Sequence, residues 1–202
     1  MKKGYHHGNL RQALVDAALE LIAAQRPNGF TLSEAAKTAD VTPAAVYRHF
    51  AGREDLIAEV ARQGFDIFAA LMEFAYAGGK PSALAAFEAT GRAYLAFARK
   101  YPGHYMAMFE SGLNLAAHPQ VADVALRAKA VQDMAAAGLA AQLPEGRRPP
   151  AAMFSAHVWA MSHGVVELFM RGKNRSPFPP EDLLETGIGI YLRGLGLLSP
   201  DR

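Results

Sequence analysis

Hydrophobic positions recur at helical spacing along almost the whole chain, and no segment shows the alternating pattern of a convincing strand. The pattern therefore predicts an all-α fold. Asn9 is a suitable N-cap for the first helix, and Pro and Gly residues separate the later ones. The expected helices cover about residues 9–25, 31–39, 43–50, 53–77, 82–100, 102–113, 119–142, 150–170 and 181–198.

A helix start is encoded at Thr31. Its hydroxyl can accept a hydrogen bond from the backbone N–H of Glu34 while the Glu34 side chain reaches back, which is the arrangement called a capping box. Along this helix Ala35, Ala36 and Ala39 share one face. Because these side chains are small, a second helix can approach closely.

A second short helix follows a turn at Asp40 and Val41. Its start suits a threonine cap and a proline, because the N–H that proline lacks would have been unpaired anyway. Val46 and Phe50, four residues apart, face inward. The helix then turns the remaining side chains outward, namely Ala44, Ala45, Tyr47, Arg48 and His49. Two short helices joined by a tight turn are the geometry that places a helix in a DNA groove.

Residues 31–50, followed by Arg53-Glu-Asp-Leu, resemble the helix-turn-helix of the TetR family of one-component bacterial repressors. The resemblance rests on Val-Tyr-Arg-His-Phe with a basic residue three positions on. It departs from the family in having Asp40 where glycine is usual and Arg53 where lysine is usual. The resemblance implies phosphate contacts from Tyr47, His49 and Arg53 and base contacts from Thr42, Pro43, Ala44, Ala45 and Arg48; Thr31 completes the expected DNA-binding set.

The same resemblance implies two domains, a three-helix DNA-binding domain over residues 1–52 and a helical effector-binding and dimerisation domain over 53–202. Members of the family dimerise through their last two helices, and a two-fold dimer matches palindromic operator DNA. In the last helix, hydrophobic residues alternate spacings of four and three, and glycines interrupt them. The expected dimer interface is Leu184, Gly187, Ile188, Tyr191, Gly194 and Leu195; packing within one chain is the alternative.

Aromatic and methionine residues are frequent in the middle of the chain and suit an adaptable pocket for a small apolar effector, which the family resemblance also implies. The expected ligand-binding residues are Phe68, Met72, Phe87, Tyr94, Met106, Phe109, Trp159 and His163. Ordinary core packing is the alternative for each of them. We expect the effector to stabilise a form of the dimer that no longer fits the operator.

Trp159-Ala-Met-Ser-His163-Gly164, like the N-terminal stretch of residues 4–11, resembles a TetR subgroup. Trp159 and His163 lie one helical turn apart and so share a face, while Gly164 lets a neighbouring helix approach. A pocket wall and a purely structural contact both explain this pattern. His6 and His7 lie just before the first helix, where phosphate contact and solvent exposure are alternatives.

Composition narrows the function without deciding it. The chain has 202 residues, of which 51% are hydrophobic and none is cysteine, so disulfides and thiolate catalysis are excluded. No apolar run is long enough to span a membrane, and we expect a cytoplasmic protein. Residues 1–53 hold seven basic and four acidic side chains, a modest positive bias at the DNA-binding end.

Catalysis finds little support in the sequence. His163 and Glu167 are four apart on one helical face, but a di-iron bundle needs repeated Glu-x-x-His units and none occurs. Nucleophile, phosphate-loop and zinc motifs are missing as well. We therefore expect no cofactor and no metal. The partners that we expect are double-stranded operator DNA, a small apolar effector and a second copy of the chain; an architectural DNA-binding dimer and, last, a helical-bundle enzyme are the alternatives.

Overall fold

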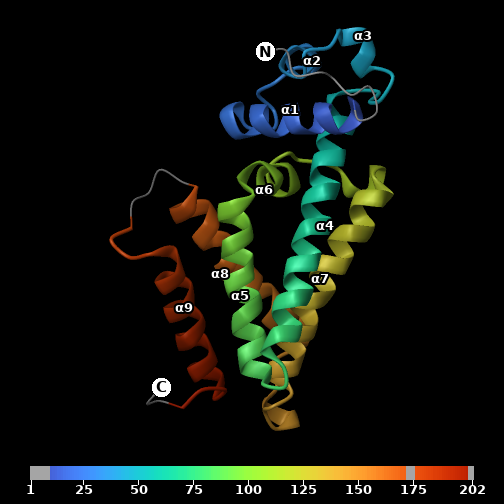
Figure 1. The fold of residues 1–202 in the computed structure, drawn as a ribbon. Coiled ribbons are helices and arrows are strands. Elements are labelled where there is room, and N and C mark those ends of the chain that lie inside the picture. Colours follow the sequence, from blue (N-terminus) through green and yellow to red (C-terminus); the bar gives the residue numbers. More distant parts are fainter. Residues whose placement is uncertain (1–9, 172–175, 200–202) are drawn as a thin grey trace. The chain divides into compact units, whose positions relative to one another are not determined.

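The computed structural model describes residues 10–171 and 176–199, and within them it contains helices and turns but no strand (Figure 1). The all-α prediction is confirmed. Asn9, His6 and His7 lie outside the described residues. Helix packing divides the chain into two compact units. The first comprises residues up to Ile67 together with Tyr101–Ala125, and the second comprises Phe68–Lys100 together with residues from Leu126 onward.

The first unit is organised around α1 (Leu10–Gln25). This helix packs against α2 (Leu32–Thr38) and also against α6 (Pro102–Phe109). Gly103 permits the second contact, because a Cβ there would lie only 3.1 Å from a methyl group of Leu19. A further short helix, α3 (Pro43–Val46), packs on α2, and the 3₁₀ turn η1 (Leu115–Ala117) follows α6.

The second short helix is shorter than the sequence predicts. α3 covers only Pro43–Val46, and the N–H groups of His49 and Phe50 both donate to the Val46 carbonyl, at 2.9 and 3.0 Å, to close a turn. Val46 and Phe50 are buried as expected. Ala45, which was expected to face outward, is only 8% exposed. Neighbouring residues of a helix point about 100° apart. The buried side of α3 is wide enough to include both Ala45 and Val46.

The long helix α4 (Arg53–Gly79) begins in the first unit and continues into the second. Most of its large hydrophobic residues are buried, namely Leu56, Ile57, Val60, Phe65, Phe68 and Met72, whereas Leu71 is exposed. The expected boundary between residues 52 and 53 stays a prediction, since the two compact units are built from discontinuous stretches of chain. α6 ends at Phe109 rather than near residue 113, and Gly112 adopts a left-handed conformation just beyond it.

The second unit contains the rest of α4 with α5 (Ala83–Lys100), α8 (Ala151–Val165), α9 (Pro180–Leu195) and the larger part of α7 (Pro119–Ala140). The residues of α7 up to Ala125 belong to the first unit. α8 packs against α5 and α9 and runs on as a π-helical turn, Val166–Met170. The short 3₁₀ turn η2 (Glu145–Arg147) precedes α8. Among the described helices, none is both long and apolar enough to cross a membrane.

Candidate nucleic-acid interface and ligand cavity

The capping box at the start of α2 is present as the sequence predicts. The N–H of Glu34 donates to the Thr31 hydroxyl at 3.2 Å, and the N–H of Thr31 donates to the Glu34 carboxylate at 2.8 Å. Hydrogen bonds from the side chain and backbone of Thr31 lower the pKa of Glu34. The Thr31 hydroxyl also donates to that carboxylate, so it has no proton to offer a phosphate while the box is intact.

The turn between α2 and α3 is tight. Asp40 has a φ of 55°, in the left-handed region where glycine is favoured, and the N–H of Val41 donates to the Ala36 carbonyl at 2.9 Å. The Thr42 hydroxyl then accepts from the N–H of Ala45 at 3.3 Å and caps α3. The cap predicted at Thr42 is therefore confirmed, and aspartate occupies a position that a glycine would adopt with less strain.

The residues after this turn form an exposed surface. Tyr47 is 61% exposed, and Arg48 and His49 are exposed beside it. Within the described part of the chain, these three side chains make no hydrogen bond or ion pair. Thr42, Pro43 and Ala44 are also exposed, whereas Ala45 is buried. We call the exposed set Thr42, Pro43, Ala44, Tyr47, Arg48 and His49 the reading surface.

Arg11 of α1 holds the back of the reading surface. Its guanidinium donates to the His49 carbonyl at 3.2 Å, lies 4.6 Å from the centre of the Phe50 ring and pairs with Glu59 of α4 at 3.0 Å. Burial raises the pKa of Glu59, but hydrogen bonds from Arg62, Gln63 and Arg11 outweigh it and lower the pKa to about 2. Sequence reasoning missed this role of Arg11, since no local spacing links residues 38 positions apart.

Arg53, expected to contact phosphate, is half-buried at the start of α4. One of its guanidinium nitrogens donates to the carbonyl oxygens of Asn28 and Phe30, at 3.0 and 3.4 Å. The side chain thus ties α4 to the loop that precedes α2. The other terminal nitrogen donates to the side-chain oxygen of Asn28 at 3.5 Å. Because a guanidinium carries five N–H donors, those outside these contacts are the part available to a phosphate.

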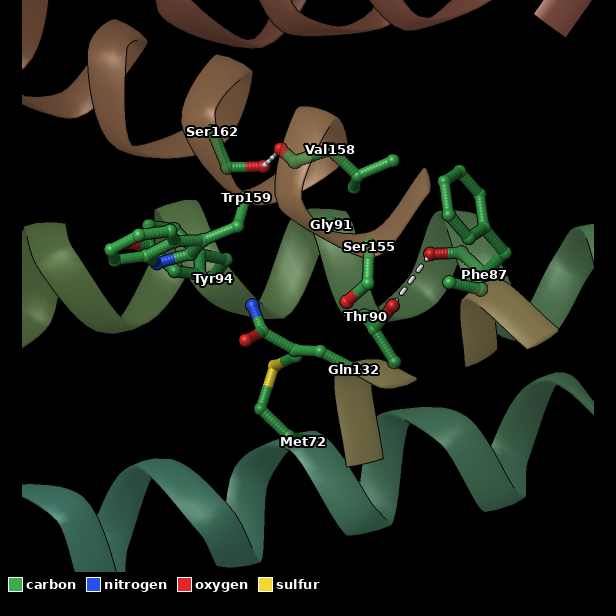
Figure 2. Close-up of a pocket in the computed structure, with 11 residues that line it drawn as sticks. Met72, Phe87, Thr90, Gly91, Tyr94, Gln132, Ser155, Val158, Trp159 and Ser162 are labelled. Atoms are coloured by element: carbon green, nitrogen blue, oxygen red, sulfur yellow. Dashed lines mark hydrogen bonds between the residues drawn. The ribbon is translucent and has the colours of Figure 1, made fainter. Parts of the chain in front are cut away.

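A cavity lies inside the second unit, between α4, α5, α7 and α8 (Figure 2). Its volume of about 20 Å³ is enough for about one water molecule. Apolar and polar side chains both line it. They are Met72, Phe87, Thr90, Gly91, Tyr94, Gln132, Ala136, Ser155, Val158, Trp159 and Ser162.

Four of the expected ligand-binding residues line this cavity, namely Met72, Phe87, Tyr94 and Trp159. Phe68 lies one layer behind, edge-on to the Tyr94 ring at 5.4 Å. Met106 and Phe109 do not line it, since α6 belongs to the first unit. The small and polar residues of the lining are not predicted by the distribution of aromatic and methionine residues. Ser155, Trp159 and Ser162 could have indicated this wall from the sequence, because spacings of four and three put them on one face of α8.

The structure places Trp159 and His163 differently with respect to the cavity. Trp159 lines the cavity, and its ring lies 5.4 Å from the His163 ring. His163 does not line it but pairs through Nδ1 with the Tyr94 hydroxyl at 3.0 Å, which fixes one wall. Burial lowers the pKa of His163 despite the nearby Glu167, so the imidazole is neutral at pH 7. A Cβ at Gly164 would meet no atom within 4 Å, so none of the described helices packs closely against it.

The residues expected at the dimer interface lie on two different faces of α9. Leu184 and Ile188 are buried within the chain, and Tyr191 accepts or donates a hydrogen bond with His157 of α8 at 3.0 Å. These residues pack inside the single chain. By contrast, a Cβ added at Gly187 or Gly194 would meet no atom within 4 Å. Leu195 is half-buried.

His163 and Glu167 were considered as a possible pair of metal ligands. In the described ranges, no group of three or more histidine, aspartate or glutamate side chains is close enough to hold an ion.

Comparison with known proteins gives matches at both ends of the chain. Residues 14–60 match the family model described as bacterial regulatory proteins, tetR family, and residues 87–191 match the model described as tetracyclin repressor-like, C-terminal domain. A stretch of 52 residues is 44% identical to the HTH-type transcriptional regulator BetI of Rhizobium meliloti (strain 1021). That match spans only about a quarter, 26%, of either protein.

Solved structures resemble the chain over nearly its full length. A protein of unknown function from Rhodococcus sp. RHA1 is 25% identical, with a TM-score of 0.78 over 96% of this chain and 98% of that one. PfmR from Thermus thermophilus, a TetR family transcriptional regulator, is 16% identical, with a TM-score of 0.71 over 89% of this chain and 97% of that one. The second likeness concerns the fold alone.

Proposed function

Since this chain belongs to the TetR family of transcriptional regulators, which are not enzymes, we propose that it binds palindromic operator DNA as a homodimer and leaves it when a small effector binds. The observation that carries the DNA-binding part is the reading surface. There a capped helix turn presents Tyr47, Arg48 and His49 to solvent without partners in the described chain. Such donors are suited to phosphate oxygens and base edges.

We assign different roles to the residues of the reading surface. Arg48 carries a fork of donors that suits the O6 and N7 atoms of guanine, and Pro43 and Ala44 can contact thymine methyl groups. Tyr47 and His49 are suited to phosphates. Because so few side chains can read base edges, the shape of the operator contributes to its recognition.

The test of this assignment compares Arg48→Ala with Tyr47→Phe on the protein's own upstream intergenic DNA, at two salt concentrations. Arg48→Ala is expected to cost about 1–3 kcal/mol on operator DNA and little on random DNA, so specificity relaxes. Tyr47→Phe removes only the hydroxyl and is expected to weaken binding to both DNAs alike. Both side chains are exposed, so neither change should alter folding.

Arg99→Ala is the matched control, because Arg99 is an exposed arginine of the second unit that pairs with Glu181. It should leave both affinities unchanged. Equal loss of specificity in Arg48→Ala and Tyr47→Phe would contradict the division of roles, and no preference for any operator over random DNA would reject the proposed function.

Small and apolar exposed residues on the last two helices support the homodimer. On α9, Gly187, Ile190 and Gly194 follow each other at spacings of three and four, and Ile190 is 62% exposed. On α8, Ala156 and Ala160 are exposed four residues apart. Each interior glycine costs about 1 kcal/mol relative to alanine, and nothing within the described chain packs against these two. A second copy of the chain would supply the missing contact.

Release by an effector requires that the effector bind one form of the dimer better than the other. The chain offers a continuous element for this coupling, because α4 carries Arg53 at one end and the cavity residue Met72 farther along. The small volume of the cavity favours a second candidate, an architectural DNA-binding dimer without effector. Titration of a small-molecule panel against the operator complex separates the two, since only the first predicts release.

A further inference from the structure

We propose that Gln132 is the polar anchor of the cavity and that the ligand is an uncharged molecule with a carboxamide or lactam group on an apolar body. The inference rests on the proposed function and specifies its effector. It begins from the position of Gln132 on α7, where its carboxamide points into the cavity among Met72, Tyr94 and Trp159 (Figure 2).

The carboxamide of Gln132 is uncommitted. It forms no hydrogen bond with any residue of the described chain, although it is half-buried in a cavity wall. A primary amide offers two N–H donors and a carbonyl acceptor in one plane. A second amide group can pair with it through one donor and one acceptor at once, which satisfies both partners.

The hydroxyl groups of the cavity wall are already hydrogen-bonded, and that of Tyr94 is paired with His163 Nδ1 at 3.0 Å. The hydroxyls of Thr90 and Ser162 donate to the backbone carbonyls of Phe87 and Val158, at 2.7 and 3.0 Å. The hydroxyl of Ser155 donates to Asp133 at 2.6 Å. These hydroxyls retain lone pairs only, so they can accept from a ligand but not donate to it. The remaining uncommitted donors of the lining are the Gln132 amide and the indole N–H of Trp159.

Charge sets the second condition. None of the eleven lining residues is charged, and a charged group in an enclosed site is costly unless it is paired. A carboxylate would face hydroxyl lone pairs without a cation to balance it, and an ammonium group would find no lining carboxylate. An uncharged group that both donates and accepts hydrogen bonds can pair with the Gln132 amide and donate to the hydroxyl oxygens without burying a charge.

The apolar body has a place beside Gly91 and Trp159. A Cβ at Gly91 would meet no atom within 4 Å, so α5 leaves space where most residues would add a side chain. The cavity must still widen to admit more than a water molecule. Trp159 is the wall that can move, because it is 43% exposed and is held on one side by the His163 ring.

The test uses the intrinsic fluorescence of Trp159, the one tryptophan of the chain. Hexanamide, hexanoate and hexylamine share an apolar body and differ in the polar group. We expect hexanamide to shift the emission at a concentration about tenfold lower than the two charged probes. Gln132→Met keeps the approximate volume and should lose this preference. Gln120→Met, at an exposed glutamine of the same helix, is the matched control and should keep it.

Gln132→Glu serves as a second variant if Gln132→Met does not fold, and it should transfer the preference to hexylamine. Equal or stronger binding of hexanoate or hexylamine to the unchanged protein would overturn the inference. So would a preference for hexanamide that survives in Gln132→Met, or the absence of any shift up to the solubility of hexanamide. The same preparations are tested on operator DNA. Intact DNA binding without a response to hexanamide rejects only this inference, and failure to bind any DNA rejects the proposed function.

Discussion

Asp40, in the turn between α2 and α3, adopts a backbone conformation that is disfavoured for its residue type. Replacement by glycine removes the clash of Cβ in the left-handed region at the cost of a more flexible unfolded chain. We expect Asp40→Gly to raise the free energy of unfolding by about 0.5–1 kcal/mol. Urea unfolding at 25 °C measures it.

Asp123→Gly is the matched control for Asp40→Gly. Asp123 is an exposed aspartate within α7, where glycine is a poorer helix former than aspartate. The control should destabilise by up to about 1 kcal/mol. Destabilisation of similar size at both positions would show that the turn tolerates aspartate without strain.

At the level of single residues, the sequence predicted interactions between near neighbours and missed the distant ones. The capping box at Thr31 and the cap at Thr42 need only a few residues of chain, and both are present. The pairing of Arg11 with His49 and Glu59 depends on how α1, α4 and the turn after α3 meet. Gln132 also carried no sequence signal, because its chemistry depends on which neighbouring hydroxyls are already hydrogen-bonded.

Between elements, the contacts of Arg11 predict an indirect effect on DNA binding. Arg11→Gln loses the Glu59 pair and the cation over Phe50, so the turn at Tyr47–His49 is less well held. Arg11 is about half exposed, so we expect a loss of only about 1 kcal/mol in operator binding. A filter-binding series in salt should give the same slope as the unchanged protein, because no phosphate contact is removed. A slope reduced by about one would instead make Arg11 a phosphate contact.

Glu59 makes the stability of the first unit depend on pH. Its pKa falls from 4.5 to about 2 on folding, so the folded state favours the carboxylate. This contribution is complete above pH 4.5 and is lost as the pH falls toward 2. We expect Glu59→Gln to be less stable at pH 7 by about 1–3 kcal/mol and to lose less stability than the unchanged protein between about pH 5 and 3. Urea unfolding at these pH values tests it, and parallel pH profiles would contradict it.

Whole elements were predicted more accurately than their ends. The long helices follow from periodicity, and α5 and α8 begin within one residue of the expected positions. α3 was expected to be twice as long, because Val46 and Phe50 share the spacing of a helix even though a turn joins them. The return of α6 to pack on α1 could not be predicted either, since periodicity says nothing about which helices meet.

At the scale of the whole molecule, replacing Gly187 and Gly194 of α9 should stabilise the helix but weaken the dimer. Gly187→Ala with Gly194→Ala should favour the helix in a single chain but place methyl groups between the two chains. We expect the dimer to weaken by about tenfold or more, as measured by sedimentation across a concentration series. Gly138→Ala, at an exposed glycine of α7, should leave the assembly unchanged. An unchanged dimer in the double variant would place the interface elsewhere.

The size of α3 has a consequence for the range of conditions in which the protein works. A helix of four residues has almost no stability of its own, and here it depends on the burial of Ala45, Val46 and Phe50. Segments with so few interactions open locally well before the rest of a protein unfolds. Recognition of DNA should therefore fail on warming at a temperature below the melting point of the fold. Through this segment, we expect DNA binding by such a regulator to depend directly on temperature.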